Sequence, residues 1–126
     1  MLASETVLIC VAPEAGADLY QFFERQFKGR GWEAHVIPVT DVGTVEPDEI
    51  AAVIAHASDW PDEKLAEWLT LIRSALGSRK RVLALLPRPG EHYPAGTQAL
   101  WTHALSYGFK ISQALEIVND FLAGRA

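Results

Sequence analysis

Cysteine is nearly missing from this sequence, because Cys10 is the only one among 126 residues. The chain cannot form an internal disulfide, which fits a reducing compartment. Cys10 lies within the apolar run of residues 6–12, and a thiol buried in a strand is usually an inert small hydrophobic group. We therefore expect neither a thiolate metal site nor a cysteine nucleophile.

Long apolar runs are also missing. No stretch approaches the roughly 20 apolar residues that cross a bilayer, and the N-terminus lacks the basic start and cleavage site of a signal peptide. These absences predict a soluble chain. Residues 2–5 (LASE) have the character of an arbitrary beginning, so excision from a larger protein is a further expectation.

Positive charge is scarce relative to negative charge. The chain has 11 Lys and Arg against 16 Asp and Glu, a formal net charge of −5. Proteins that bind a phosphate backbone need a basic face, so we expect no nucleic-acid partner. The single basic cluster, residues 79–81 (RKR), is better explained by cations that follow a helix C-terminus than by an anion site.

Several signatures of nucleotide and hydrolase sites are absent. The sequence contains no G-x-x-x-x-G-K-[ST], no G-x-G-x-x-G after its first apolar run and no G-x-S-x-G. The histidines are scattered singly, without the i,i+4 pair that a metal site on a helix would use: His35, His56, His92 and His103. We therefore expect no metal, no cofactor and no catalytic residue.

A phosphotransfer receiver domain is disfavoured for a related reason. Such a domain needs paired acids at the end of its first strand, an aspartate ending the third and a lysine ending a later one. Here the first apolar run ends Val-Ala-Pro and the most apolar one ends Leu-Pro-Arg, and only Asp59 lies roughly in place.

The segment around which we expect the rest to fold is residues 82–86 (VLALL). Five consecutive apolar residues, with charges before them and two prolines soon after, are typical of a strand buried on both faces of a parallel sheet. Other apolar runs predict further strands, and apolar residues at steps of three and four predict amphipathic helices. The predicted strands are residues 6–12, 32–39, 52–57, 82–86 and 109–111; the predicted helices begin near Asp18 (as N-cap), Pro61, Thr97 and Ser112, the third of them ending at Gly108.

Residues 50–57 (IAAVIAHA) fit two structures. Their apolar residues have helical spacing, and Pro47 with the acids after it would make a good helix start. A strand keeps the regular alternation of elements, whereas a helix would abut the next helix with almost no connector. We therefore predict a strand over residues 52–57, although the crossover before it is then unusually short for a parallel connection.

The alternation of strands and helices predicts one α/β domain over residues 1–126. The expected architecture is a three-layer sandwich, with a mostly parallel sheet of four or five strands in the flavodoxin-like order 2-1-3-4-5. Pro38 places the second strand at an edge, because proline cannot donate to a ladder on both sides.

In such a sheet, ligands bind beyond the carboxyl ends of the strands. The weak candidates for ligand-binding residues there are Glu14, Asp41, His56, Asp59 and Arg88. Each has a structural alternative. Asp59 is also explained as a cap of the following helix, and Glu14 with Arg88 as a salt bridge on the rim.

Trp60 is the weak candidate for an interface residue. It precedes Pro61 at a strand–helix junction, and aromatic side chains on a rim are favoured at interfaces. Packing against the core at the helix start is an equally good explanation.

Three segments resemble a known bacterial family. They are SDWPDEKLAEWLTLIRSALG (58–77), RVLALLPRPG (81–90) and LWTHALSYG (100–108). Together they look like the soluble C-terminal domain of a membrane-protein family of unknown function, typically encoded beside a GTPase-like protein. This chain departs from the pattern by having a single proline after Trp60 and an extra Tyr93-Pro94.

The resemblance implies a cytoplasmic domain whose parent protein carries transmembrane helices upstream, with a protein partner that the GTPase-like neighbour would supply. It implies no catalytic residues. The favoured function is therefore a non-enzymatic interaction or regulatory module. The alternative is a small enzyme or nucleotide-responsive domain that uses the strand-end residues Glu14, His56, Asp59 and Arg88.

Overall fold

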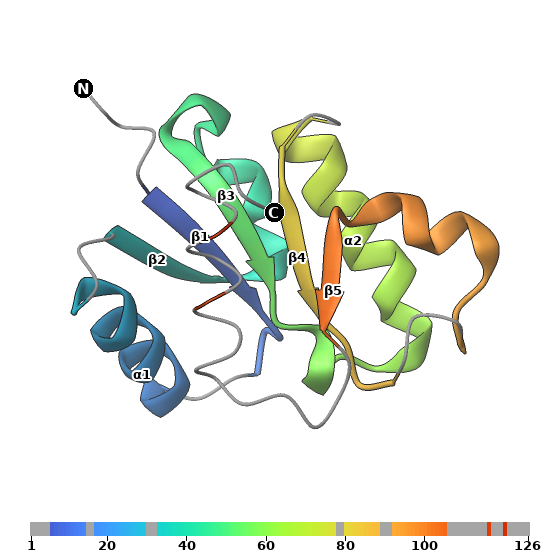
Figure 1. The fold of residues 1–126 in the computed structure, drawn as a ribbon, viewed down its shortest axis with the longest axis horizontal. Helices are drawn as coiled ribbons and strands as arrows, with labels where there is room; N and C mark the ends of the chain where they lie inside the picture. The colour runs from blue at the N-terminus through green and yellow to red at the C-terminus, as the bar shows by residue number, and fades with distance from the viewer. Residues whose placement is uncertain are drawn as a thin grey trace.

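The fold is one five-stranded parallel sheet with helices against it. The computed structural model describes residues 6–14, 17–29, 33–77, 80–88 and 92–105, together with Glu116 and Asp120. All the strand pairings are parallel and the order is β2-β1-β3-β4-β5 (Figure 1). The strands are β1 (Thr6–Val11), β2 (Glu33–Pro38), β3 (Ile50–Ala55), β4 (Val82–Leu85) and β5 (His103–Leu105). The predicted fold class and strand order are confirmed.

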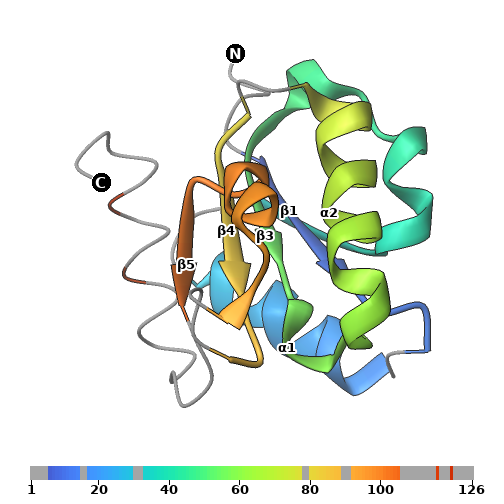
Figure 2. The same ribbon diagram turned by 90° about the vertical axis from the view of Figure 1, so that its right-hand side faces the viewer.

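Two α-helices connect strands of the sheet: α1 (Ala17–Lys28) leads from β1 to β2, and α2 (Asp62–Leu76) leads from β3 to β4. Along the sheet, the connection through α1 leads from β1 outward to β2, and the connection through α2 leads in the opposite direction, from β3 to β4. Right-handed crossovers in opposite directions place their helices on opposite faces of a sheet. Figure 2 shows α2 standing on one side of the strands.

The first turn of α1 differs from the prediction in one detail. The helix begins at Ala17, so Asp18 lies in its first turn and is not the N-cap. A carboxylate in that position still interacts favourably with the positive end of the helix dipole.

The segment from β2 to β3 settles the ambiguity over residues 50–57. Residues Ile50–Ala55 form strand β3, as predicted. The crossover before it consists of two 3-10 helices, η2 (Val39–Thr44) and η3 (Pro47–Glu49). A 3-10 helix rises about 2.0 Å per residue against 1.5 Å for an α-helix, so this short segment can cross the sheet.

The central strands are sealed from solvent. Every residue from Val82 to Leu86 is fully buried, as predicted for the segment around which the chain folds. Alternate side chains of the strands enter one apolar cluster with the inner faces of η2 and α2. This cluster includes Leu8, Cys10, Val39, Val42, Val53, Ala55, Leu65, Trp68, Leu69, Ile72, Leu76, Val82, Ala84 and Leu86.

The helix predicted from Thr97 to Gly108 is wrong over its described part, residues 97–105. The chain instead forms a 3-10 helix, η6 (Ala95–Leu100), and then strand β5. Backbone bonds tie this segment to β4: the Thr102 N–H donates to the Val82 carbonyl at 2.8 Å and the Leu86 N–H to the Leu105 carbonyl at 2.7 Å. A buried strand needs partners for its backbone groups, and this need outweighs the helical spacing of the apolar residues.

Two further predictions fall wholly or largely outside the described residues. The predicted strand 109–111 is not described. Of the helix predicted from Ser112, only Glu116 and Asp120 are described, and both are helical. No helix in the described ranges combines the length and apolar character needed to cross a membrane.

The packing of α2 yields a matched test. Leu69 is 0% exposed and Leu71, two residues further on, is 38% exposed. We expect Leu69→Ala to lower the free energy of unfolding by about 2–5 kcal/mol through a lost contact and a cavity. Leu71→Ala should change it by no more than about 0.5 kcal/mol. Urea unfolding of both variants measures the difference, and equal losses would contradict this packing of α2.

Candidate functional site

The carboxyl edge of the sheet, where a ligand was expected, begins with three buried strand ends. β1 continues into Ala12, β3 into His56 and Ala57, and β4 into Leu86, and all four residues are buried. The His56 N–H donates to the Cys10 carbonyl at 2.9 Å, which extends the pairing of β1 with β3 by one step. These ends therefore form part of the packed interior.

The side chain of Trp60 packs in the same apolar cluster as these strand ends. It is 3% exposed and lies against Trp68 in a T-shaped pair, with ring centroids 5.3 Å apart and planes at 85°. The expectation of an exposed Trp60 is wrong, and the alternative of a side chain packed on the core describes the structure. The proline at position 61 caps α2 and starts the helix, which turns the preceding tryptophan inward onto the same helix.

One polar atom of Trp60 has no hydrogen-bond partner among the described residues. The indole Nε1 is buried and makes no hydrogen bond within the described part of the chain. An unsatisfied buried donor costs about 1–3 kcal/mol, so the apolar contacts of the ring must outweigh this cost.

A second aromatic pair lies in the loop after β4. Tyr93 is buried and forms a T-shaped pair with Trp101, with centroids 6.1 Å apart. The Tyr93 hydroxyl accepts a hydrogen bond from the backbone N–H of Arg88 at 3.3 Å. The guanidinium of Arg88 lies 5.3 Å from the centre of the tyrosine ring. The Arg88 side chain also forms a salt bridge with Asp62 at 3.1 Å.

Among the described residues, the structure does not form the predicted salt bridge between Glu14 and Arg88. The ion-pair partner of Arg88 among the described residues is Asp62 and not Glu14, which is exposed on the loop after β1. Asp41 is exposed in η2, where its carbonyl accepts from the Thr44 hydroxyl at 2.7 Å. The backbone of Asp59 lies in η4 (Ala57–Asp59), beyond the strand end that His56 occupies. Whether any of them binds a ligand stays a prediction.

Sequence reasoning missed Asp62 and Tyr93 as partners of Arg88. Asp62 follows Pro61 in the first turn of α2, where the helix dipole alone explains an acidic residue, and Tyr93 has no periodic neighbours in a loop rich in proline. Only the close approach of that loop to the start of α2 brings them together. The resulting exposed salt bridge is worth about 0–1 kcal/mol and the cation–π contact about 0.5–1 kcal/mol, so Asp62 and Tyr93 hold the Arg88 side chain with similar strength.

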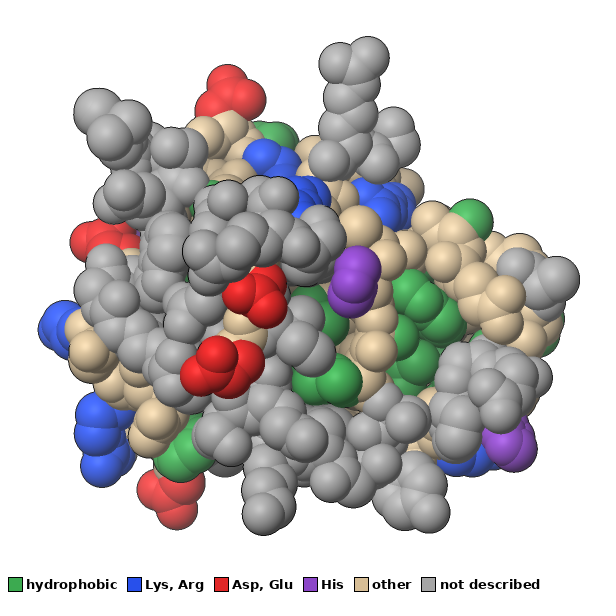
Figure 3. Space-filling view, viewed as in Figure 1, with side chains coloured by type: hydrophobic (Ala, Val, Ile, Leu, Met, Phe, Trp, Pro, Cys, Tyr) green, Lys and Arg blue, Asp and Glu red, His purple; other side chains and the backbone are tan. Residues whose placement is uncertain are grey.

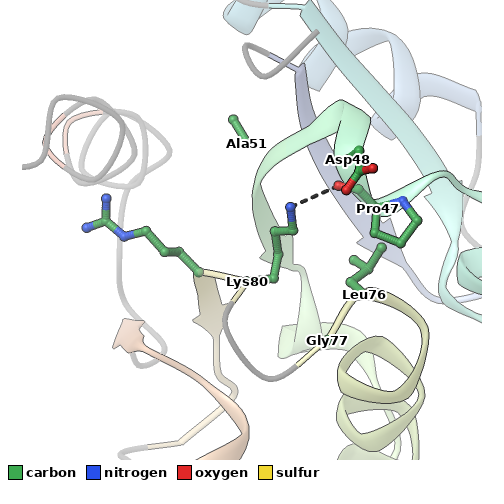
Figure 4. Close-up of a pocket in the computed structure, with 7 residues that line it drawn as sticks. Pro47, Asp48, Ala51, Leu76, Gly77 and Lys80 are labelled. Atoms are coloured by element: carbon green, nitrogen blue, oxygen red, sulfur yellow. Dashed lines mark hydrogen bonds between the residues drawn. The ribbon is translucent and has the colours of Figure 1, made fainter.

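Hollows in the described surface lie at the opposite, amino-terminal edge of the sheet. One has a volume of about 530 Å³ and is lined by Pro47, Asp48, Leu76 and Lys80, among others (Figure 4). Lys80 reaches across it, and its ammonium group donates to the Pro47 carbonyl at 2.9 Å and the Ile50 carbonyl at 2.6 Å. The Lys80 side chain is thus engaged by backbone carbonyls at the start of β3, and the interpretation of the basic cluster as cations that follow a helix C-terminus stays a prediction.

Arg73 joins the same network from the last turn of α2. Its guanidinium donates to the carbonyls of Lys80 at 2.5 Å, Leu100 at 3.1 Å and Gly77 at 3.5 Å. Partial burial lowers the pKa of the Arg73 guanidinium, yet it stays positively charged because its ordinary pKa is so high. Gly77 ends the helix with a φ of +95°, a conformation that L side chains rarely adopt.

Metal-binding groups do not gather in the described part of the chain. No three His, Cys, Asp or Glu side chains there lie close enough together to hold an ion. The edge of the sheet at β5 exposes apolar side chains beside a histidine: Figure 3 shows hydrophobic side chains at the surface there, Ala104 and His103 are exposed, and Trp101 and Leu105 are half-buried.

Comparison with known proteins identifies the fold. No protein-family model and no curated protein sequence matches the chain. Among solved structures, the receiver domain of Francisella response regulator 1452 has a TM-score of 0.68 at 15% identity and covers 97% of this chain and 99% of that one. The chain shares its flavodoxin-like fold with that receiver domain.

Two further structures extend the comparison. The Vibrio cholerae chemotaxis protein CheY4 has a TM-score of 0.66 at 14% identity, covering 92% of this chain and 97% of its own. A putative pilus assembly-related protein from Burkholderia pseudomallei has a TM-score of 0.65 at 10% identity, covering 100% and 95%. At these identities the likeness extends to the fold alone, and the expectation against phosphotransfer chemistry stays a prediction.

The engagement of Lys80 is testable with a matched lysine. We expect Lys80→Met to lower the free energy of unfolding by about 2 kcal/mol, because two hydrogen bonds from a charged group are lost. Lys64 makes only an exposed ion pair with Glu67, so Lys64→Met should cost less than about 0.5 kcal/mol. Urea unfolding compares the two variants, and an equal effect would contradict the role assigned to Lys80.

Cys10 gives a test of burial by pH. Burial raises the pKa of its thiol from 9.0 to about 12, so the folded state keeps the proton that the unfolded state releases. The resulting stability is fully present below pH 9 and is lost as the pH rises toward 12, at about 1.4 kcal/mol per unit. Urea midpoints between pH 8 and 10.5 should fall more steeply for the natural chain than for Cys10→Ala. Parallel slopes would contradict this prediction.

Proposed function

We propose that the chain is a non-enzymatic interaction or regulatory module with the receiver fold, which acts by binding a protein partner. The observation that carries the proposal is the packing at the carboxyl edge of the sheet. There, in place of a polar crevice, the described structure has buried strand ends and the T-shaped pairs Trp60–Trp68 and Tyr93–Trp101.

The residues at the strand ends support a mode of action without phosphoryl transfer. Ala12 follows β1, His56 follows β3 and Leu86 follows β4, and none of these is a carboxylate that could accept a phosphoryl group or hold its magnesium ion. A receiver fold with these residues can still present its surface to a partner, because the surface does not depend on the chemistry at the strand ends.

The cellular setting is part of the same proposal. The motifs over residues 58–77, 81–90 and 100–108 favour a cytoplasmic domain of a bacterial membrane protein, with a GTPase-like neighbour as the partner. A regulatory role is consistent with the use of this fold in the response regulator and the chemotaxis protein that it resembles.

The enzymatic alternative requires Glu14, His56, Asp59 and Arg88 to converge. In the structure Arg88 is engaged by Asp62 and Tyr93, and Glu14 lies exposed. A specific observation in favour of this alternative is therefore missing from the described residues.

Direct binding tests the proposal. Calorimetry of the purified chain against the GTPase-like protein encoded beside the parent gene should give a dissociation constant in the micromolar range or below, which corresponds to about −8 kcal/mol. In parallel, thermal unfolding with nucleotides, and with acetyl phosphate plus magnesium, should leave the melting temperature unchanged, since a ligand of the native state would raise it.

Two results would count against the proposal. A melting temperature raised by a nucleotide or phosphate, and no longer raised in Arg88→Gln, would favour the enzymatic alternative. Failure of the two proteins to associate would remove the proposed partner.

A further inference from the structure

Strand β2 forms an open edge of the sheet. It is the last strand on its side and pairs only with β1 among the described residues, so one row of its backbone N–H and C=O groups lacks a strand partner. The ends of the edge are guarded by the exposed carboxylate of Glu33 and by Pro38, both of which discourage unspecific pairing. Residues 34–37 remain as a short segment on which a strand from another chain can form.

Two hollows flank this edge, one on each face of the sheet. His35 lines both of them. The first, of about 190 Å³, lies toward α1 and includes Glu24 and Ala34; the second, of about 250 Å³, lies beneath the crossover from β2 to β3 and includes Ile37. Side chains of a strand alternate between the two faces, so a strand added to β2 would place its side chains in turn on the two faces that hold these hollows. The second hollow extends inward from β2 over β1 to Ile50, within reach of a long side chain only.

The hollow beneath the crossover has an apolar floor and an acidic rim. Its floor includes Leu8, which is fully buried, Ile37 and Ile50, and its rim includes the exposed carboxylates of Glu46 and Glu49. The short 3-10 crossover leaves this space open where a longer helix would cover the strands. A long basic side chain suits such a site, because its aliphatic stem packs on apolar groups while its charge meets the carboxylates.

The charge around the edge selects the kind of partner. Residues 39–50 contain four acidic residues and no Lys, Arg or His, and Glu33 adds a fifth carboxylate at the start of β2. The hollow toward α1 is lined by both Glu24 and Lys28, so the excess of negative charge lies on the side of the crossover. A second copy of this chain would bring like charges to the same edge, which disfavours self-association there. A basic segment is complementary to it.

We propose that an extended basic segment of a protein partner adds a strand to β2 and places an Arg or Lys side chain between Glu46 and Glu49. This inference rests on the proposed function and assigns a surface and a partner chemistry to it. Backbone pairing with residues 34–37 supplies the alignment, and the hollow beneath the crossover supplies the preference for a basic side chain.

The test uses the peptide Ac-TRTRTRT-NH2 as the probe and its glutamate counterpart Ac-TETETET-NH2. Binding is followed by amide chemical shifts of the isotope-labelled chain during titration. We expect the arginine peptide to bind, with shifts concentrated in residues 33–38 and 46–50, and the glutamate peptide to cause none. A third peptide, N-methylated at alternate residues on the pairing edge, keeps the charge but cannot donate those hydrogen bonds, and its affinity should fall at least about tenfold.

Matched variants locate the charge effect. Glu46→Lys with Glu49→Lys should weaken the arginine peptide at least about tenfold. Glu63→Lys with Glu67→Lys changes the net charge equally on the exposed surface of α2 and should weaken it less than about twofold. Equal weakening by both pairs, or equal binding of the N-methylated peptide, would overturn the inference in favour of unspecific charge attraction, and so would absence of binding by the arginine peptide.

The outcome is separable from that of the proposed function. If the GTPase-like protein binds the natural chain and the Glu46/Glu49 double variant equally well, the docking surface is wrong while the interaction module stands. If the arginine peptide binds at β2 and the GTPase-like protein does not bind at all, the surface stands and the named partner is wrong.

Discussion

The pairing of β4 on both of its sides is the constraint on which the rest of the structure depends. Val82–Leu85 is fully buried, with β3 along one side and β5 along the other. Backbone groups removed from water must find partners within the protein. The chain therefore supplies a parallel strand on each side, and each parallel connection requires a crossover over a face of the sheet.

This constraint explains the largest difference from the sequence-based prediction. Residues 100–105 have apolar side chains at helical spacing, which indicated a helix ending at Gly108. In the fold, the Thr102 N–H and the Leu105 carbonyl bond to the backbone of β4 and its continuation at Leu86. The local preference for helix is worth a few tenths of a kcal/mol per residue, whereas leaving several buried backbone groups unpaired costs more.

The same packing determines which edges of the sheet are covered by aromatic side chains and which have hollows beside them. Trp60 and Tyr93 close the carboxyl edge, since each is buried against another aromatic ring. The hollows described above lie at the amino-terminal edge and beside β2, next to the short 3-10 crossover. In the described structure, aromatic side chains are packed at the carboxyl edge of the sheet, and the outer edge of β2 has no strand partner among the described residues. The proposed function rests on the packing at the carboxyl edge, and the proposed docking surface rests on the edge of β2.

The sequence by itself determined the fold class, the strand order and the buried central strand. The reason is that a run of five apolar residues, and the alternation of strand-like with helix-like spacing of apolar residues, can be recognised from neighbouring residues alone. Proline at position 38 also predicted the edge position of β2. Only the tertiary structure decided the strand at His103–Leu105, the inward position of Trp60 and the partners of Arg88. These depend on which distant segments meet, and pairing of backbone groups or rings across the fold leaves no periodic signal in the order of the residues.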